Sequence, residues 1–306
     1  MPKKRGNLRN KSELLAVRSF LSAVGALPLE TSMRFGKSLG KMLGTRFPKL
    51  QKTARRNLEI AFPEMPEPER EKIIRGTFES LGRHLGFVSH FRKFRHADIR
   101  HLVEVVGREH LDRAFEAGNG VIFFTGHFGS WEVFNLLPPA FGFGMNILVR
   151  RLDNPLIENF VDNFRTQFGS VTLDKTKSAR TMFRVLEKGE ILGILADLNV
   201  QEREGTFVDF FGVPASTTTS IAKLALKTGA AVLPAFAVWD ESKKKYVVHL
   251  EPPVEYLAGD NSDANVRELT QRITNVVERY VREYPEQWLW IHKRWNTRPK
   301  GEKPLY

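Results

Sequence analysis

The sequence predicts an α/β fold, with a central mixed, largely parallel sheet flanked by helices and a basic helical segment ahead of it. From about residue 102 onward, short runs of apolar and β-branched residues alternate with amphipathic stretches of helical length. This alternation is typical of a sheet with helices on its faces. The first hundred residues carry the three-to-four-residue apolar spacing of helices. We therefore expect a helical segment over residues 1–100 and an α/β domain over residues 101–306, in one continuous structural unit.

The N-terminal segment is expected to start with a loose basic stretch, residues 2–12, followed by an amphipathic helix over Leu14–Leu27. That helix would span about 21 Å, short of the ~30 Å hydrocarbon core of a bilayer, and Arg18 interrupts its apolar run. It is expected to lie in a membrane interface or to pack on the protein's own core. A signal peptide is the rival interpretation, and Arg18 argues against it. Further helices are expected at Glu30–Arg46, Lys52–Ala61 and Glu69–His90.

The α/β part is expected to begin with a strand and to alternate from there. The expected strands are Val103–Val106, Val121–Phe124, Asn146–Val149, Val171–Leu173, Ile191–Leu195, Thr206–Phe210, Ala231–Val238 and Tyr246–Leu250. The expected helices are Arg108–Ala117, Trp131–Leu137, Pro155–Phe168, Ser178–Glu187, Ser220–Lys227 and Ala264–Tyr284. In sheets of this kind, ligand sites gather beyond the carboxyl ends of the strands.

The composition is that of a globular protein, with 306 residues of which 42% are hydrophobic and 27% charged. The absence of cysteine excludes disulfides, thiolate metal sites and a Cys nucleophile, and it fits a reducing compartment. Residues 1–60 hold 14 Lys and Arg against three Glu, so +11 of the net charge of +12 lies there. This concentration indicates a polyanionic partner, which is nucleic acid, anionic lipid or an acidic protein, or else a solvated surface.

The stretch from Val121 to Glu132 combines an apolar strand, a glycine-containing turn and the start of a helix. His127 and Glu132 are five positions apart, a spacing that places them on different faces of a regular helix. They can meet only if His127 lies outside the helix and the turn folds it back. Gly126 and Gly129 permit such a path.

An imidazole beside a carboxylate at the end of a strand is a general-base arrangement, because the carboxylate fixes the ring tautomer and stabilises the imidazolium. His127 would then activate a hydroxyl, with Glu132 orienting the ring. The alternative is structural: His127 caps the strand or the helix, and Glu132 is an ordinary acid of the first helical turn. Ser130 is expected to cap that helix.

The segment Gly126–Glu132 resembles the His-x4-Asp/Glu motif of the glycerolipid (lysophospholipid) acyltransferase superfamily. Its form is that of the bacterial lipid A biosynthesis (lauroyl/myristoyl) acyltransferases. Further segments match in the same order over most of the chain, from about Arg55 to Pro299, and they are Arg150–Pro155, Leu195–Asn199, Val208–Gly212 and Tyr284–Trp295. The chain departs from the family where Ser130 replaces the common Asn and Leu198 the common Gln, which puts contacts around the motif in doubt.

The resemblance implies a glycerolipid acyltransferase-like fold and transfer of a fatty acyl chain to a hydroxyl of a lipid A precursor, late in lipopolysaccharide biosynthesis. The donor would be acyl-acyl carrier protein or acyl-CoA, acting as a co-substrate, with no metal or bound cofactor. Implied partners are an anionic glycolipid acceptor, acyl carrier protein and the inner membrane surface, and nucleic acid is not among them. The protein would lie on the cytoplasmic face of the inner membrane, peripherally or anchored in the interface.

The same resemblance associates Arg150 and Arg151, with Asn154, with substrate binding, and guanidinium groups suit phosphate or carboxylate. Asp197 and Asn199 follow the apolar run before them and are expected to position substrate or the catalytic loop. The structural alternatives are that Arg150 and Arg151 are ordinary surface residues and that Asp197 and Asn199 belong to a turn that Asx side chains stabilise.

Stabilisation of a developing oxyanion is expected from a backbone N–H near Gly129 and Ser130, or from an arginine. The aromatic-rich segment Gly205–Pro214 is expected to form a hairpin or a bulged strand. Its side chains are suited either to an acyl-chain wall or to core packing. Three tryptophans near the C-terminus, interleaved with basic residues, are expected at a lipid headgroup layer by the resemblance, with base stacking as the alternative. They are Trp288, Trp290 and Trp295.

Two other functions remain open from the sequence. One is acylation of another membrane lipid, such as a phosphatidylinositol mannoside or an aminolipid, from acyl-CoA. The other is a peripheral membrane-binding or nucleic-acid-binding module without catalysis. Ser130 does not match the hydrolase Gly-x-Ser-x-Gly pattern, because Trp131 and Glu132 follow it. A dinucleotide fingerprint, a phosphate-binding P-loop and a zinc-ligand spacing around His127 do not occur.

Overall fold

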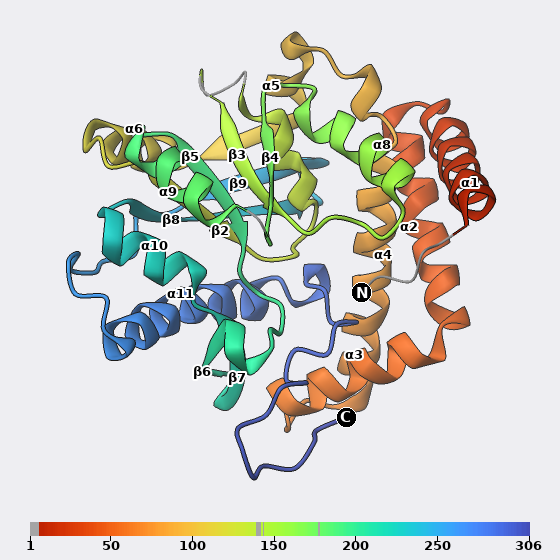
Figure 1. The fold of residues 1–306 in the computed structure, drawn as a ribbon. Coiled ribbons are helices and arrows are strands. Elements are labelled where there is room, and N and C mark those ends of the chain that lie inside the picture. The colour runs from red at the N-terminus through yellow and green to blue at the C-terminus, as the bar shows by residue number, and fades with distance from the viewer. Residues whose placement is uncertain (1–5, 139–141, 143, 177) are drawn as a thin grey trace.

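The computed structural model describes residues 6–138, 142, 144–176 and 178–306. Within them the main sheet has seven strands in the order β1-β9-β8-β2-β5-β3-β4 (Figure 1). Five strands, from β8 to β4, are parallel, and β9 joins β8 antiparallel while β1 joins β9 in parallel. The strands are β1 (Val103–Val106), β2 (Val121–Thr125), β3 (Met145–Val149), β4 (Val171–Asp174), β5 (Ile191–Leu195), β8 (Ala231–Asp240) and β9 (Lys245–Leu250). The predicted mixed, largely parallel sheet is confirmed.

Helices cover both faces of this sheet. One hydrophobic cluster joins the sheet to α9, α10 and α11, and a second joins the opposite face to α6, η3 and α8. Their bounds are α5 (Ile99–Leu102), α6 (Arg108–Glu116), η3 (Trp131–Leu136), α8 (Pro155–Thr166), α9 (Ala179–Glu187), α10 (Ser220–Thr228) and α11 (Asp263–Glu283). The remaining short turns are η1 (Phe91–Lys93), η2 (His96–Asp98), η4 (Glu202–Glu204) and η5 (Pro285–Gln287).

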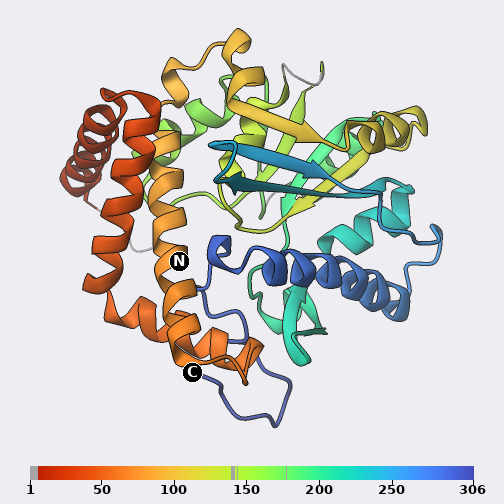
Figure 2. The same ribbon diagram turned by 180° about the vertical axis from the view of Figure 1, so that it is seen from behind.

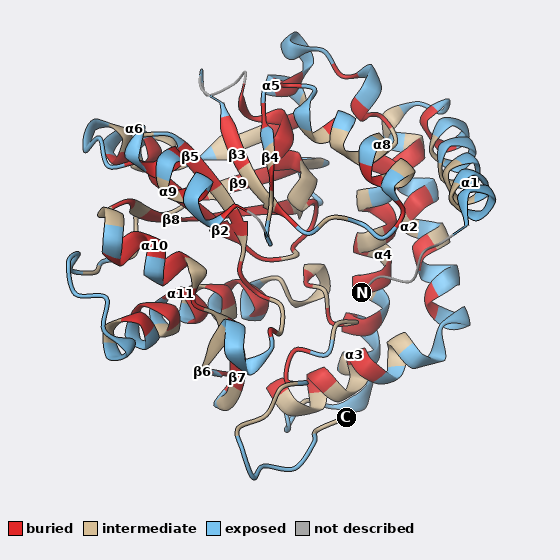
Figure 3. Cartoon of the chain, viewed as in Figure 1, coloured by how far each residue is buried: buried red, intermediate tan, exposed pale blue. Residues whose placement is uncertain are grey.

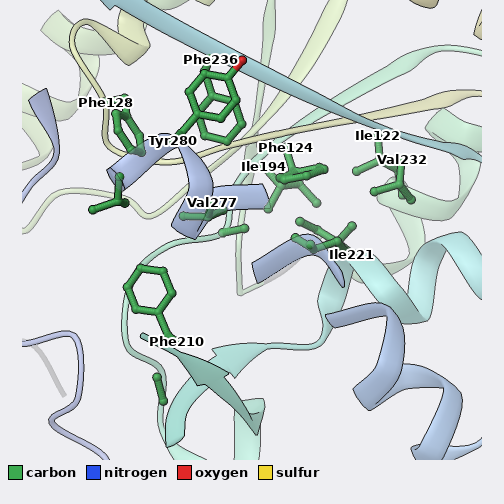
Figure 4. Packing of buried hydrophobic residues seen from close by; sticks show 14 of the residues in the cluster. Ile122, Phe124, Phe128, Ile194, Phe210, Ile221, Val232, Phe236, Val277 and Tyr280 are labelled. Atoms are coloured by element: carbon green, nitrogen blue, oxygen red, sulfur yellow. The ribbon is translucent and has the colours of Figure 1, made fainter. Parts of the chain in front are cut away.

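The central strand β2 is buried along its whole length, as expected for a parallel strand covered on both faces. Because side chains alternate along a strand, Ile122 and Phe124 point into the first cluster while Val121 and Phe123 point into the second. Figure 4 shows Ile122 and Phe124 packed with Val232 of β8 and Ile221 of α10. The apolar run that predicted this strand is thus the centre of two cores.

Four helices form the N-terminal segment: α1 (Asn7–Gly25), α2 (Leu29–Arg46), α3 (Pro48–Ala61) and α4 (Glu67–Val88). Figure 2 shows them together on one side of the molecule. They are not a separate layer, because Ile73 and Phe78 of α4 belong to the first core and Phe87 to the second. The prediction of a loose stretch over residues 2–12 is wrong from Asn7 onward, where α1 begins, and residues 2–5 of that stretch lie outside the described residues. In the described residues no helix is both long and apolar enough to cross a bilayer.

In the C-terminal part the structure corrects one expectation and decides between two alternatives. The tryptophans expected at a headgroup layer are core residues, with Trp288 only 2% exposed and Trp290 and Trp295 fully buried. The aromatic-rich segment is also core: it forms β6 (Gly205–Phe210), and Phe210 packs on Trp288 and Trp295. Strand β7 (Val213–Thr218) pairs antiparallel with β6, so the hairpin alternative is confirmed, but its second strand runs on to Thr218, beyond the predicted end at Pro214.

Candidate active site

A cavity of about 520 Å³ lies at the carboxyl ends of β2, β3 and β5. Part of its wall is apolar and runs along one face of the sheet beneath η3, where Phe123, Ile147 and Phe134 lie. Polar and charged side chains also line it, among them His127, Glu132, Asn135, Arg150, Arg165, Lys175, Asn199 and His292. The cavity is where a parallel sheet is expected to hold its ligand.

His127 and Asp197 are brought together by the sheet. They lie in the turns after β2 and β5, and the last residues of these two strands, Thr125 and Leu195, are paired in the register. The His127 backbone N–H donates to Asp197 Oδ2 at 2.7 Å, and the ring Nδ1–H donates to Asp197 Oδ1 at 2.8 Å. Because the carboxylate accepts the Nδ1 proton, Nε2 remains as the ring nitrogen that can take a proton.

Asp197 is a fully buried carboxylate. Trp288 Nε1–H donates a third hydrogen bond to it, at 2.8 Å. Burial favours a higher pKa for Asp197, but the His127 ring and the hydrogen bonds from His127 and Trp288 outweigh burial and lower that pKa. Asp197 is therefore ionised at neutral pH and stabilises positive charge on His127.

The orienting carboxylate expected at Glu132 is Asp197 in the structure. Glu132 lines the same cavity, but its carboxylate accepts hydrogen bonds from Arg165 Nε at 3.1 Å and Nη2 at 2.5 Å, and from Asn135 Nδ2 at 2.6 Å. Across the parts of the chain that the structure describes, no hydrogen bond or ion pair joins Glu132 to His127. The reason is that α8 packs Arg165 against η3, and a guanidinium binds a carboxylate more strongly than a neutral ring does.

The pKa of Glu132 also reflects this ion pair. Burial by itself raises the pKa of the carboxyl, whereas the hydrogen bonds and the charge of Arg165 lower it, and the second effect is the larger. Glu132 and Arg165 thus form an ionised pair in the cavity wall, with side-chain exposures of only 12% and 18%.

Ser130 connects the turn to the N-terminal helices. Its hydroxyl lies 2.8 Å from Nδ1 of His84 in α4, and it makes no capping bond to η3, in contrast to the expectation. The His84 ring stacks on Trp131 at 4.4 Å between centroids, and Trp131 meets the His127 ring at 4.9 Å. The pKa of His84 is lowered to about 4, chiefly by burial; the charge of Glu132 opposes this shift, and the charges of His127 and Arg165 add to it. His84 is therefore neutral at pH 7.

Gly129 allows the turn to adopt its conformation, but its backbone N–H is not free to bind an oxyanion. Its N–H donates to the Gln287 carbonyl oxygen at 3.0 Å, so the N–H expected to face an oxyanion is already used. Its φ of +45° lies in the left-handed region, and a Cβ there would stand 2.4 Å from the Ala237 carbonyl oxygen. Glycine is required at this position by both conformation and space.

The three residues expected to bind substrate after β3 have different environments. Arg150 is exposed, lines the cavity and makes no described hydrogen bond or ion pair. Arg151 points away from the cavity to Glu158 of α8, at 2.9 Å. Asn154 is buried: its Oδ1 caps α8 and its Nδ2 donates at 3.0 Å to Glu13 of α1. Arg151 and Asn154 therefore stabilise the loop and its contact with α1.

Asn199 lines the cavity, but its side-chain amide is already bonded to Thr297, through Nδ2 to Oγ1 at 3.0 Å and through Oδ1 from the Thr297 N–H at 2.9 Å. Its backbone N–H donates to Nε2 of His292 at 3.2 Å. Burial lowers the pKa of His292, which keeps this second cavity imidazole neutral. Asn199 thus anchors the C-terminal segment beside the cavity.

Sequence reasoning did not find Arg165, His84 or His292 as cavity or turn residues. Each comes from a helix or segment far from His127 in the chain, and no local spacing marks it. Within the described residues, no three His, Asp or Glu side chains are grouped as metal ligands.

The comparisons with known proteins agree on one family. A family model for bacterial lipid A biosynthesis acyltransferases matches residues 2–297. The lipid A biosynthesis lauroyltransferase of Escherichia coli is 32% identical over 286 residues, which cover 92% of this chain and 90% of the relative. The palmitoleoyltransferase of the same organism is 29% identical, with the same coverage. Its myristoyltransferase is 25% identical, over 90% of this chain and 85% of the relative.

Proposed function

The chain belongs to the bacterial lipid A biosynthesis acyltransferases, and from this we propose that it transfers a fatty acyl group from acyl-acyl carrier protein or acyl-CoA to a hydroxyl of a lipid A precursor. Its relatives are named for different acyl groups, so membership of the family does not decide which acyl chain is transferred. The observation that supports the proposal most directly is an imidazole held by a buried carboxylate in a cavity with an apolar wall.

In the proposed reaction, His127 Nε2 takes the proton of the acceptor hydroxyl as the oxygen attacks the thioester carbonyl carbon. Asp197 stabilises the imidazolium that results. The C–S bond breaks as the ester C–O bond is completed, and the thiolate leaves with the proton that His127 returns. The thioester and the alcohol are thus converted to an ester and a thiol, and the reaction as written needs no oxidant and no metal.

The developing oxyanion needs a donor in the cavity. Because the Gly129 N–H is used by Gln287, we assign this part to Arg165, a cation in the cavity wall. Glu132 then acts by holding the Arg165 guanidinium in place through a two-pronged ion pair. Arg150 and Lys175, which line the cavity and are exposed, are suited to the phosphates of either substrate.

For the location of the protein, we propose peripheral association with the cytoplasmic face of the inner membrane through α1 and α2. Both helices are largely exposed on their outer side (Figure 3). Phe35 and Met42 of α2, seven residues apart on one face, are 46% and 51% exposed, and Leu15 of α1 is 67% exposed. Exposed Arg34 and Lys41 accompany them. Apolar residues flanked by cations are typical of a helix in an anionic lipid interface.

Binding to vesicles tests this location. The double variant Phe35→Ser/Met42→Ser is expected to bind vesicles rich in phosphatidylglycerol at least about tenfold more weakly, since two apolar side chains no longer leave water. Wild-type protein is expected to bind pure phosphatidylcholine vesicles weakly. Equal binding of wild type and double variant to anionic vesicles would contradict the assignment of this face.

Mass spectrometry of product lipids tests the reaction. Purified wild-type protein and His127→Ala are each given an acyl carrier protein thioester or acyl-CoA, with a lipid A precursor or with a phosphatidylinositol mannoside. We expect wild-type protein to acylate the lipid A precursor and His127→Ala to be slower by about a thousandfold. Equal product from the two proteins would remove His127 as the base, and acylation of the mannoside alone would replace the acceptor.

A further inference from the structure

Gly193 is a gap in the side chains that form the cavity wall. It is the middle residue of β5, and the register places it between Phe123 of β2 and Ile147 of β3. Its sequence neighbours Leu192 and Ile194 are buried in the core on the opposite face of the sheet. Gly193 itself is only half-buried, because its side of the strand faces the cavity.

The space above Gly193 can accommodate a Cβ without a clash, and no positive φ requires glycine there. A Cβ at this position would have as its nearest atoms Met145 Sδ and the Asn146 carbonyl oxygen, both at 3.7 Å, which is an ordinary contact distance. The backbone is that of a regular strand, so a residue with a Cβ can adopt it without backbone strain. A glycine inside a strand weakens the strand and often marks the close approach of a ligand. Glycine is therefore not required here by backbone or packing.

The gap gives access to the deeper part of the cavity. Residues that share a face of a strand follow each other at about 6.6 Å. Leu195, at the mouth, is followed on this face by Gly193 and then by Ile191, whose partner on β3 is Met145. Met145 also lines the cavity. A chain that enters beside His127 must pass over Gly193 before it reaches Met145.

We propose that the missing side chain at Gly193 sets the length of the acyl chain that this enzyme accepts, with Met145 forming the deep end of the channel. The inference rests on the proposed function, since it takes the cavity to hold the acyl group of the donor. The walls at this depth, Phe123, Ile147 and Phe134, are apolar and match a hydrocarbon chain. An apolar pocket distinguishes chains by roughly tenfold or more for each methylene that does not fit.

The test compares wild type, Gly193→Ala and Gly193→Val with octanoyl-, decanoyl-, dodecanoyl-, tetradecanoyl- and hexadecanoyl-CoA. Transfer to the lipid A precursor is followed by mass spectrometry, and binding of each thioester by calorimetry. We expect Gly193→Val to lose at least about tenfold in kcat/KM with the longest donor that wild type uses well, and to prefer a shorter one. Gly193→Ala should lie between the two. The matched control is Ala231→Val, which adds methyl groups on the same face of the sheet as Gly193 but on β8, outside the cavity. This variant should keep the wild-type preference for acyl-chain length.

A second variant covers failure of Gly193→Val to fold. Met145→Ala lengthens the channel and should shift the preferred donor to a longer chain. An unchanged chain-length profile in either folded variant overturns the role of Gly193 or Met145 while leaving the proposed function intact. Length-selective binding that shifts in these variants, without transfer of any acyl group by wild type, would instead remove the proposed reaction and leave the channel assignment standing.

Discussion

Asp197 accepts two hydrogen bonds from His127, one from the backbone N–H at 2.7 Å and one from ring Nδ1 at 2.8 Å. One buried carboxylate thus fixes both the path of the turn after β2 and the orientation of the imidazole that the turn carries. The two residues are 70 positions apart in the chain and meet only because β2 and β5 are neighbours in the sheet. The position of the proposed base is therefore a property of the sheet topology.

The variant Asp197→Asn tests this relationship. An amide can donate to Nδ1, which places the ring proton on Nε2 and removes the nitrogen that takes the substrate proton. We expect kcat to fall by about a hundredfold or more, with little change in the KM for the donor. The control is Asp209→Asn, which changes an exposed carboxylate on β6. A folded Asp197→Asn enzyme with wild-type kcat would contradict the role given to Asp197.

The Glu132–Arg165 pair is tested by a double-mutant cycle. If Glu132 acts by holding Arg165, then Glu132→Gln and Arg165→Gln remove the same interaction, and the double variant should be no slower than the slower single variant. We expect each single change to lower kcat by about tenfold to a thousandfold. The measurement is the rate of ester formation at saturating donor.

Glu132 was predicted from the sequence to act on His127 directly, and the same cycle tests that prediction. In that case the two single changes would affect different groups, and their effects on kcat would multiply in the double variant. Urea unfolding of the four proteins provides the control, because removing one partner of a largely buried pair costs about 3 kcal/mol in stability.

Much of the fold could be predicted because it is local. The apolar run Ile191–Leu195 has the bounds found for β5, and Glu30–Arg46 differs from α2 by one residue at its start. The continuation of β7 beyond Pro214 was not predicted because its Ser and Thr residues lack an apolar alternation and are recognisable as a strand only by their pairing with β6. The strand order was also not predictable, since it depends on contacts between distant segments.

The candidate site, too, could be predicted only where it depends on residues that are close together in the chain. His127, placed at the end of a strand, lies where the sequence put it, because strand and turn are adjacent in the chain. Its carboxylate partner was sought nearby, at Glu132, because only local spacing is visible in one sequence. The partner found, Asp197, had been expected to position substrate or the catalytic loop, and it does contact that loop.

The close packing of α2 on α4 predicts a large effect of a small substitution. A Cβ at Gly40 would stand 2.1 Å from the Phe78 carbonyl oxygen, so Gly40→Ala must move the two helices apart. In an isolated helix the same change stabilises by up to about 1 kcal/mol. Here we expect destabilisation by about 1–3 kcal/mol, measured as the free energy of unfolding in urea. Gly6→Ala is the control, since nothing lies within 4 Å of a Cβ there; stabilisation by Gly40→Ala would contradict the packing.

His84 predicts a specific dependence of stability on pH. Its pKa is lowered to about 4 in the folded protein, chiefly by burial, against an ordinary value of 6.5. Below pH 6.5 the unfolded chain therefore binds a proton that the folded protein does not, and folding becomes less favourable as the pH falls. Between pH 7 and pH 5 this residue alone should cost up to about 2 kcal/mol of stability.

The variant His84→Gln isolates this contribution, because glutamine keeps a hydrogen-bonding side chain beside Ser130 but does not titrate. Burial also lowers the pKa of His90, His249 and His292, so the wild-type protein loses stability from several sources over the same range. We therefore expect His84→Gln to lose less stability than wild type between pH 7 and pH 5, in urea unfolding at each pH. Because the His84 ring stacks on Trp131 beside His127, the variant should also lower kcat at pH 7. Identical pH dependence in the two proteins would show that the His84 ring is accessible to protons in the folded state.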